Sequence, residues 1–271
     1  MTGSFGTPAA ATTVPVHVDK TVFADVIPGE GRVVTTGAQD VQFATTILNG
    51  TTGGTLVSAP TQVTPVDQWG GYYAGIATML DCAAEGSRIV GVAAPGDMGV
   101  DAAASLGLGE DDSAVIVIDL QKVYLPAADG QPQRVTDNSL PQVVLAPDGR
   151  PGIIVPDSDA PTDLRIEVLK KGDGEKVAAD STVRVHYTGV TWADREVFDS
   201  SWEKGASTAF TLDGVVPGFA QALEGQAVGS QVLAVIPPEL GYGDQATGSI
   251  PAGSTLVFVI DILGIDQAAT Q

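Results

Sequence analysis

Apolar and polar side chains alternate along much of this chain, and the alternation predicts strands. In residues 183–188 it places Tyr187 on one face and His186 on the other. Residues 231–236 and 256–262 show a similar apolar strand pattern. We therefore expect Tyr187 to face a core, and we expect His186 to have a structural role on the opposite face.

One short helix is predicted between these strands. Pro217 suits the first position of a helix, Phe219, Ala222 and Leu223 follow at helical spacing, and Gly225 supplies a stop. Strands that enclose a single short helix are typical of the α+β class. We predict an antiparallel sheet that closes over this helix.

The sequence repeats itself at an offset of about 143 residues. Residues 75–80 match residues 218–223, and residues 115–120 match residues 257–262. Ordered matches at one offset indicate an internal duplication. We therefore expect two copies of one α+β fold.

Composition changes along the chain suggest four segments. Residues 1–15 are rich in Thr, Ala, Gly and Pro and predict a disordered lead-in, and residues 16–125 form the first copy. Seven prolines in residues 126–163 predict an extended linker, in which one edge strand is expected at residues 142–145. Residues 164–271 form the second copy.

Charge and cysteine content exclude several kinds of function. The 271 residues include 13 Lys and Arg against 33 Asp and Glu, a formal net charge of −20, which argues against binding to nucleic acid or anionic lipid. No apolar run is long enough to predict a membrane-spanning segment. One cysteine cannot form an intrachain disulfide, and with two histidines it cannot supply the usual structural zinc site. We expect neither a metal nor a cofactor.

Five short blocks in the second copy carry a family resemblance. In chain order, they are VHYTG at 185–189, FDSS at 198–201, VPGF at 216–219, GYG at 241–243, and IP at 250–251 followed by LVF at 256–258. Together they resemble the FK506-binding protein (FKBP) family of peptidyl-prolyl cis-trans isomerases over residues 164–265. The resemblance implies two FKBP-like domains, each a twisted antiparallel sheet wrapped over one short helix.

The implied reaction is rotation about an X-Pro amide, which is hindered by a barrier of about 18–20 kcal/mol because resonance keeps the bond planar. No covalent step is needed. An apolar, preorganised cavity that removes the amide from water disfavours the planar ground state more than the twisted transition state. The alternative is a non-catalytic chaperone or adaptor module that binds Pro-containing peptides.

The resemblance also implies roles for individual residues. The catalytic candidates are Tyr187, Phe198, Asp199 and Tyr242, and the substrate-binding candidates are Val215, Val216, Phe219, Ile250 and Phe258. Phe219 would form the floor under the proline ring, and Ile250 would lie at the rim. The Val216 N–H and the Tyr242 hydroxyl would donate to substrate carbonyls, while Asp199 would be held near Tyr187 and act through its charge.

The first copy lacks these groups at the corresponding positions. The offset gives Thr45 for Tyr187, Leu56–Val57 for Phe198–Asp199, Ile76 for Phe219, Gly99 for Tyr242 and Ile116 for Phe258. We therefore expect the first copy to keep the fold without the isomerase site. Its aromatic cluster, formed by Trp69, Tyr72 and Tyr73, could line a peptide groove, but we favour core packing.

The expected partners are Pro-containing polypeptide clients and FK506- or rapamycin-type macrolides. The duplication and low Cys content resemble exported bacterial foldases of this family, so we expect an exported or envelope-associated protein whose signal has been removed.

Overall fold

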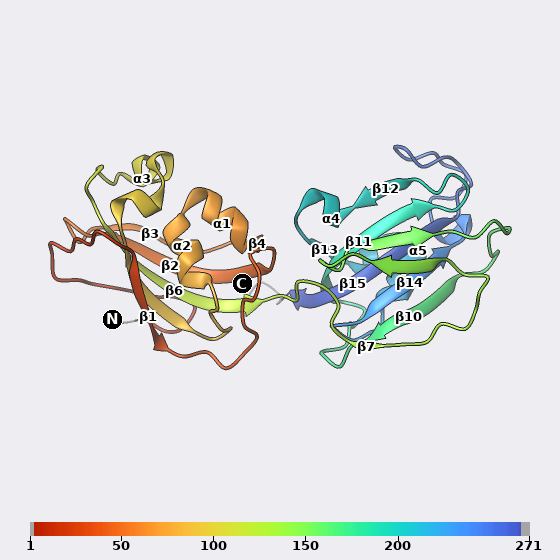
Figure 1. Ribbon diagram of the computed structural model, residues 1–271, viewed down its shortest axis with the longest axis horizontal. Coiled ribbons are helices and arrows are strands. Elements are labelled where there is room, and N and C mark those ends of the chain that lie inside the picture. The colour runs from red at the N-terminus through yellow and green to blue at the C-terminus, as the bar shows by residue number, and fades with distance from the viewer. Residues whose placement is uncertain (1–2, 267–271) are drawn as a thin grey trace. The chain divides into compact units, whose positions relative to one another are not determined.

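A computed structural model describes residues 3–266. Residues 1–2 of the predicted lead-in and residues 267–271 of the second copy lie outside the described residues. The chain forms two compact units, unit 1 at Met1–Tyr124 and unit 2 at Leu125–Gln271 (Figure 1). Each unit contains an antiparallel sheet and short helices, so the predicted α+β class is confirmed.

Unit 1 is built on a six-stranded sheet with the order β1-β5-β6-β2-β3, and β4 also pairs with β2. Its strands are β1 (Val22–Ile27), β2 (Asp40–Asn49), β3 (Thr55–Pro60), β4 (Thr64–Pro65), β5 (Arg88–Ala93) and β6 (Ala114–Val123). Its helices are α1 (Val66–Tyr72), α2 (Ala74–Leu80) and α3 (Val100–Leu106), with a 3-10 turn at Pro95–Met98. In addition to the single helix expected, which is α2, unit 1 thus contains α1 and α3.

Unit 2 contains a seven-stranded sheet with the order β12-β11-β15-β14-β10-β7, and β13 also pairs with β11. Its strands are β7 (Gln131–Pro132), β10 (Arg165–Lys171), β11 (Thr182–Thr191), β12 (Val197–Ser200), β13 (Thr208–Thr211), β14 (Gln231–Ile236) and β15 (Leu256–Asp266). A separate hairpin consists of β8 (Gln142–Leu145) and β9 (Pro151–Ile154). The helices are α4 (Ser201–Lys204) and α5 (Pro217–Leu223), with 3-10 turns at Leu212–Gly214 and Pro238–Leu240.

The two sheets share one topology, which confirms the predicted duplication of the fold. Strands β1, β5, β6, β2 and β3 occupy the same order as β10, β14, β15, β11 and β12. The irregularities in pairing repeat as well, after residues 25, 42 and 47 in unit 1 and after residues 168, 184 and 189 in unit 2. Because a β-bulge locally bends and twists its strand, the repeated bulges give both sheets the same local bends.

The predicted helix in the second copy is α5, which packs on the sheet through Phe219, Ala222 and Leu223. Close packing depends on Gly218, because a Cβ there would lie 2.4 Å from Cγ2 of Ile236 on β14. The chain leaves the helix through Gly225, whose φ is 78°, a backbone conformation that favours glycine.

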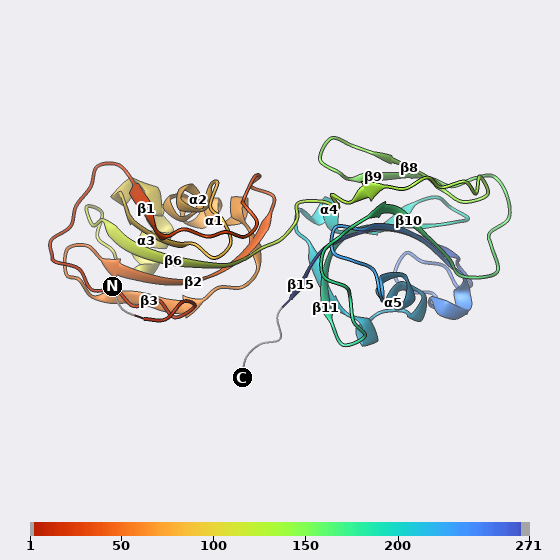
Figure 2. The ribbon, with the colours of Figure 1, turned by 90° about the horizontal axis from the view of Figure 1, so that it is seen from below.

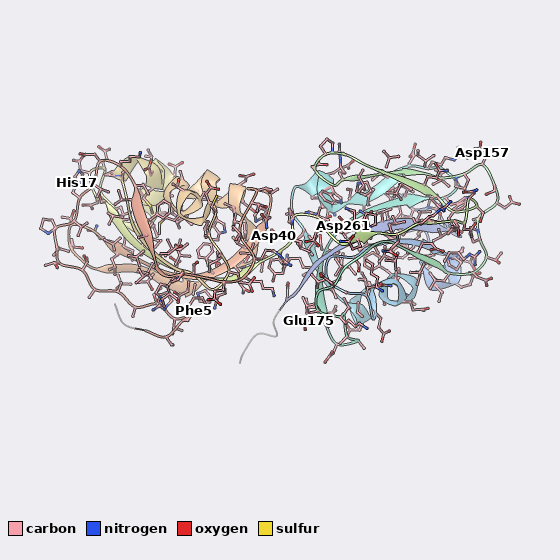
Figure 3. All side chains as sticks on the ribbon, turned by 60° about the horizontal axis from the view of Figure 1, so that its bottom comes forward. Phe5, His17, Asp40, Asp157, Glu175 and Asp261 are labelled. Carbon is pink, nitrogen blue, oxygen red and sulfur yellow. The ribbon has the colours of Figure 1, made fainter. Side chains whose placement is uncertain are left out.

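The lead-in of unit 1 is docked on its sheet, which differs from the expected disorder. The Gly6 N–H donates to Oδ2 of Asp119 at 2.7 Å, and Oγ1 of Thr46 donates to the carbonyl of Pro8 at 2.6 Å. Asp119 is fully buried and is paired with Arg88 at 2.6 Å. A buried carboxylate needs hydrogen-bond donors, and the segment before the sheet supplies one of them to Asp119. This bond helps to hold the segment in place. Phe5, on this segment, stays at the surface (Figure 3).

The expected linker is also part of a folded unit. Leu140 and Val155 are buried in a cluster with Trp192 and other residues of the unit 2 sheet, and hairpin β8–β9 lies on the sheet face opposite α5 (Figure 2). The Ala128 N–H donates at 2.8 Å to Asp261, a buried residue inside unit 2 (Figure 3). The prolines lie mostly outside the short strands, so they did not prevent this packing.

Candidate functional site

Unit 2 contains an open cavity of about 420 Å³. Its lining comes from β11, β12, β13, α5, β15 and the loops beside α5 and after β14: Tyr187, Phe198, Asp199, Phe210, Asp213, Gly214, Val215, Val216, Phe219, Tyr242 and Phe258. A volume of this size is in the range of sites that bind small molecules or short peptide segments.

Five aromatic rings form the apolar part of the cavity. Phe219, on α5, is 4 % exposed, and its ring meets that of Phe258 edge to face at 5.1 Å. The rings of Tyr187 and Phe210 lie at 6.2 Å and 5.6 Å from Phe219. Such tilted contacts are favourable for aromatic quadrupoles and hold each ring in place. The cavity is therefore shaped by packing among its own wall residues.

A glycine on β11 makes room for this packing. A Cβ at Gly189 would lie 2.5 Å from the ring of Phe198 and 2.7 Å from the ring of Phe258. These two rings meet edge to face at 5.4 Å. Any larger residue at Gly189 would force both rings out of their positions.

One carboxylate is fixed at the wall of the cavity. The Tyr187 hydroxyl donates to Oδ2 of Asp199 at 2.7 Å, and Nζ of Lys204 lies 2.5 Å from Oδ1. Burial alone would raise the pKa of Asp199, but the hydrogen bonds from Lys204 and Tyr187 outweigh it and hold the pKa below its ordinary value. Asp199 is therefore ionised at neutral pH.

The partner of this carboxylate stays protonated. Burial, followed by the hydrogen bond and the negative charge of Asp199, raises the pKa of Tyr187 far above that of a free phenol. The Tyr187 O–H thus remains a donor, and neither member of the pair changes its charge near neutral pH. This arrangement suits an electrostatic role and offers no proton transfer.

The structure brings eight of the nine predicted site residues into this lining. Ile250, expected at the rim, is 6 % exposed and is not among the lining residues, and its backbone pairs with Thr247. The prediction missed Phe210, Asp213 and Gly214. The alternation in residues 208–211 was a signal for Phe210, since it places that ring on one face of a short strand.

His186 lies on the other face of β11, as the alternation predicts. Its ring stacks on Trp202 at 4.1 Å, and its Nδ1 is 2.9 Å from Oγ of Ser201. Burial lowers the pKa of His186 to about 4, so the ring is neutral near neutral pH. His186 does not line the cavity.

Unit 1 has a smaller cavity at the corresponding place, about 200 Å³, with Thr45, Ile47, Val57, Trp69, Tyr73 and Ile76 in its lining. Oγ1 of Thr45 donates to the Val117 carbonyl of its own sheet. Trp69 and Tyr73 pack against the core and also line this cavity, whereas Tyr72 is 61 % exposed. Gly99 lies outside this lining and precedes α3.

Comparisons with known proteins match unit 2. The family model "FKBP-type peptidyl-prolyl cis-trans isomerase" matches residues 173–263. A "Probable FK506-binding protein" of Corynebacterium glutamicum is 39 % identical over 114 residues, which are 42 % of this chain and 97 % of that protein. The chain belongs to the FKBP family of peptidyl-prolyl cis-trans isomerases.

Two further FKBP relatives match a similar share of this chain. The "FK506-binding protein" of Streptomyces anulatus is 38 % identical over 120 residues, covering 43 % of this chain and 97 % of that protein. The "FKBP-type peptidyl-prolyl cis-trans isomerase FkpA" of Escherichia coli K12 is 40 % identical over 107 residues, covering 40 % of this chain and 39 % of that protein. The FKBP family model lies wholly within unit 2, which also holds the aromatic cavity.

The described residues contain no helix long and apolar enough to cross a membrane. Within residues 3–266, no group of His, Cys, Asp and Glu is arranged to hold a metal ion.

Proposed function

We propose that the aromatic cavity of unit 2 is the isomerase site, and that it accelerates X-Pro rotation in polypeptide clients. The observation that carries the proposal is an apolar cavity in which the ionised carboxylate of Asp199 is held at the wall by Tyr187. This combination suits a reaction that needs an apolar environment and a fixed electric field, but no nucleophile and no proton carrier.

Desolvation is the first part of the mechanism. The proline ring would rest on Phe219 between the rings of Tyr187 and Phe258, which removes the adjoining amide from water. A planar amide is strongly dipolar and loses hydration there, whereas the twisted amide has lost its resonance and much of its dipole. The barrier from bound planar amide to twisted amide is therefore lower than in water.

Hydrogen bonds then orient the peptide. The Val216 N–H precedes the first turn of α5, and the Tyr242 side chain is 39 % exposed beside the cavity. Each would donate to a substrate carbonyl on either side of the proline. Asp199 would favour the orientation in which the partly positive carbonyl carbon of the rotating amide faces its charge.

The same cavity would take FK506- or rapamycin-type macrolides, whose apolar rings match its lining. We assign catalysis to unit 2, which includes residues 125–163, and client recruitment or spacing to unit 1. We also expect no binding to nucleic acid, because the net charge is −20. Export to the cell envelope stays a prediction, which fractionation of producing cells would test.

The direct experiment measures cis-to-trans exchange of a short Leu-Pro peptide with the full chain. Uncatalysed exchange takes tens to hundreds of seconds, so acceleration is easy to observe. We expect acceleration that FK506 suppresses and that Asp199→Leu and Tyr242→Phe reduce. Tyr72→Phe, an exposed tyrosine of unit 1, is the matched control and should leave the rate unchanged. A folded chain that does not accelerate the exchange would refute the proposal.

A further inference from the structure

The two units differ at the outer edge of their sheets. In the sheet of unit 2, β7 lies beside β10 at the outer edge, and its Pro132 and Gln131 pair with Lys170 and Lys171. In unit 1, the equivalent strand β1 is the last of its sheet, and it pairs only with β5 among residues 3–266. The same edge is therefore covered at one end of the strand in unit 2 and open in unit 1.

The open edge carries large apolar side chains. All six residues of β1 are exposed, and Val22, Phe23, Val26 and Ile27 are 53 %, 45 %, 55 % and 44 % exposed. Apolar edge strands are a hazard that proteins normally cover or interrupt with charge. Here the strand's one charge is that of Asp25.

Unit 2 shows how this edge can be covered. Leu169, the bulge residue that corresponds to Val26, packs with the cluster that includes Leu140 and Val155 of the preceding segment. The Gln133 N–H donates to the Leu169 carbonyl at 2.8 Å. The bulge in β10 therefore does not prevent an added strand, and the identical bulge in β1 does not prevent one along Val22–Ile27, although Pro28 lacks an N–H where Lys171 pairs with β7.

The segment before β1 does not fill this role. Its described contacts go elsewhere, from Gly6 to Asp119, from Val16 to the Gly50 carbonyl, and from Val18 to Oγ of Ser113. Residues 3–266 thus supply no strand for the β1 edge.

We propose that β1 captures an extended, unfolded polypeptide segment of alternating apolar and basic residues, which adds to the sheet as a further strand. The backbone of such a segment would satisfy the free edge, and its apolar side chains would cover Phe23 and Val26. Charge decides between the possible occupants. Residues 1–125 contain four Lys and Arg against thirteen Asp and Glu, so a basic segment is attracted, whereas a second copy brings a further charge of −20.

This binding is separate from the isomerase site and would give unit 1 an activity of its own. It holds a client in an extended form without requiring proline. The test therefore uses a labelled peptide of alternating valine and lysine, free of proline, with the full chain. Binding is followed by fluorescence anisotropy, and amide hydrogen exchange reports which strand becomes protected.

We expect saturable binding and new protection of the β1 amides. Phe23→Lys with Val26→Lys should weaken binding by about tenfold or more, since it replaces the apolar contact with like charge. Val144→Lys with Ile154→Lys is the matched control, because these strand residues of β8 and β9 are 61 % and 57 % exposed and the pair adds the same charge. Both variants should keep the wild-type circular dichroism and the wild-type rate on a Leu-Pro peptide.

Three results would overturn the proposal. The first is equal binding by the β1 variant and the control with lysine at positions 144 and 154, which would mean that charge alone attracts the peptide. The second is binding without protection of β1. The third is self-association of the wild-type chain in sedimentation that the β1 variant abolishes, which would make a second copy the occupant of the edge.

Discussion

The cavity of unit 2 and the cavity of unit 1 occupy corresponding places in two sheets of the same topology, yet they differ in chemistry. Unit 2 has Tyr187, Asp199 and Phe219 in its lining, and the pairing of β2 with β3 and of β11 with β12 puts Val57 where Asp199 lies. Unit 1 retains the bulges and the core alternation without any carboxylate in its lining. The fold therefore does not depend on the site, and the site can be lost without loss of the sheet.

A second difference concerns the acid buried in each sheet. Asp119 of unit 1 is paired with Arg88, whereas Asp261 of unit 2 accepts hydrogen bonds from neutral donors, the Ala128 N–H and Gln231 Nε2. Burial raises the pKa of Asp261, and the hydrogen bonds of Ala128 and Gln231 oppose this effect. At equivalent positions, the buried carboxylate is thus stabilised by a positive charge in unit 1 and by neutral hydrogen-bond donors in unit 2.

The largest expected effect follows from this contrast. Asp119→Ala leaves Arg88 buried without its counter-charge, and we expect a loss of about 3–5 kcal/mol in the stability of unit 1. Asp261→Ala leaves only neutral donors unpaired, and we expect about 1–3 kcal/mol in unit 2. Urea unfolding of both variants, followed by probes in each unit, measures the difference. Equal losses of stability in the two variants would contradict the expectation that leaving Arg88 without a counter-charge costs more than leaving neutral donors unpaired.

Filling the space at Gly189 should damage the site more than the fold. Unit 1 has Ile47 at the equivalent position. Gly189→Ile therefore introduces the residue type of unit 1, whose side chain would clash with the rings of Phe198 and Phe258. We expect a loss of stability of about 1–3 kcal/mol and a fall in isomerase kcat/KM of about a hundredfold. Gly152→Ala is the control, because a Cβ there meets its nearest neighbour at an ordinary 3.5 Å. Unchanged kinetics in Gly189→Ile would argue against ring positions as the basis of activity.

The smallest effect concerns pH. Because the folded pKa of Asp199 is lowered, the carboxylate stays charged to a lower pH than an ordinary Asp does, and activity should decline only below the usual titration range of that residue type. Lys204→Met removes one of the bonds that lower this pKa, so the decline should begin at higher pH while the rate at neutral pH changes only a fewfold, since Lys204 is 59 % exposed. An unshifted pH profile of kcat/KM would contradict the role of Lys204.

The sequence allowed the fold and most of the site to be predicted because both are local patterns. Alternation placed Tyr187 and His186 on opposite faces, and the ordered motif blocks led to most of the cavity lining. The role of the segments before each sheet could not be predicted, since Gly6 meets Asp119 across 113 positions of sequence and Ala128 meets Asp261 across 133. Such contacts leave no periodicity in the segments themselves, whose Pro and Gly content instead suggested disorder or a linker.

The central claim is that the isomerase site exists in unit 2 because of a few side chains that unit 1 lacks. The most direct test places the unit 1 residues into unit 2 as Tyr187→Thr, Asp199→Val and Phe219→Ile together, in the full chain. The account expects cis-to-trans exchange of a Leu-Pro peptide to return to the uncatalysed rate, with the cooperative unfolding of unit 2 retained. Undiminished acceleration by this folded variant would contradict the account, because catalysis would then have to reside outside this cavity.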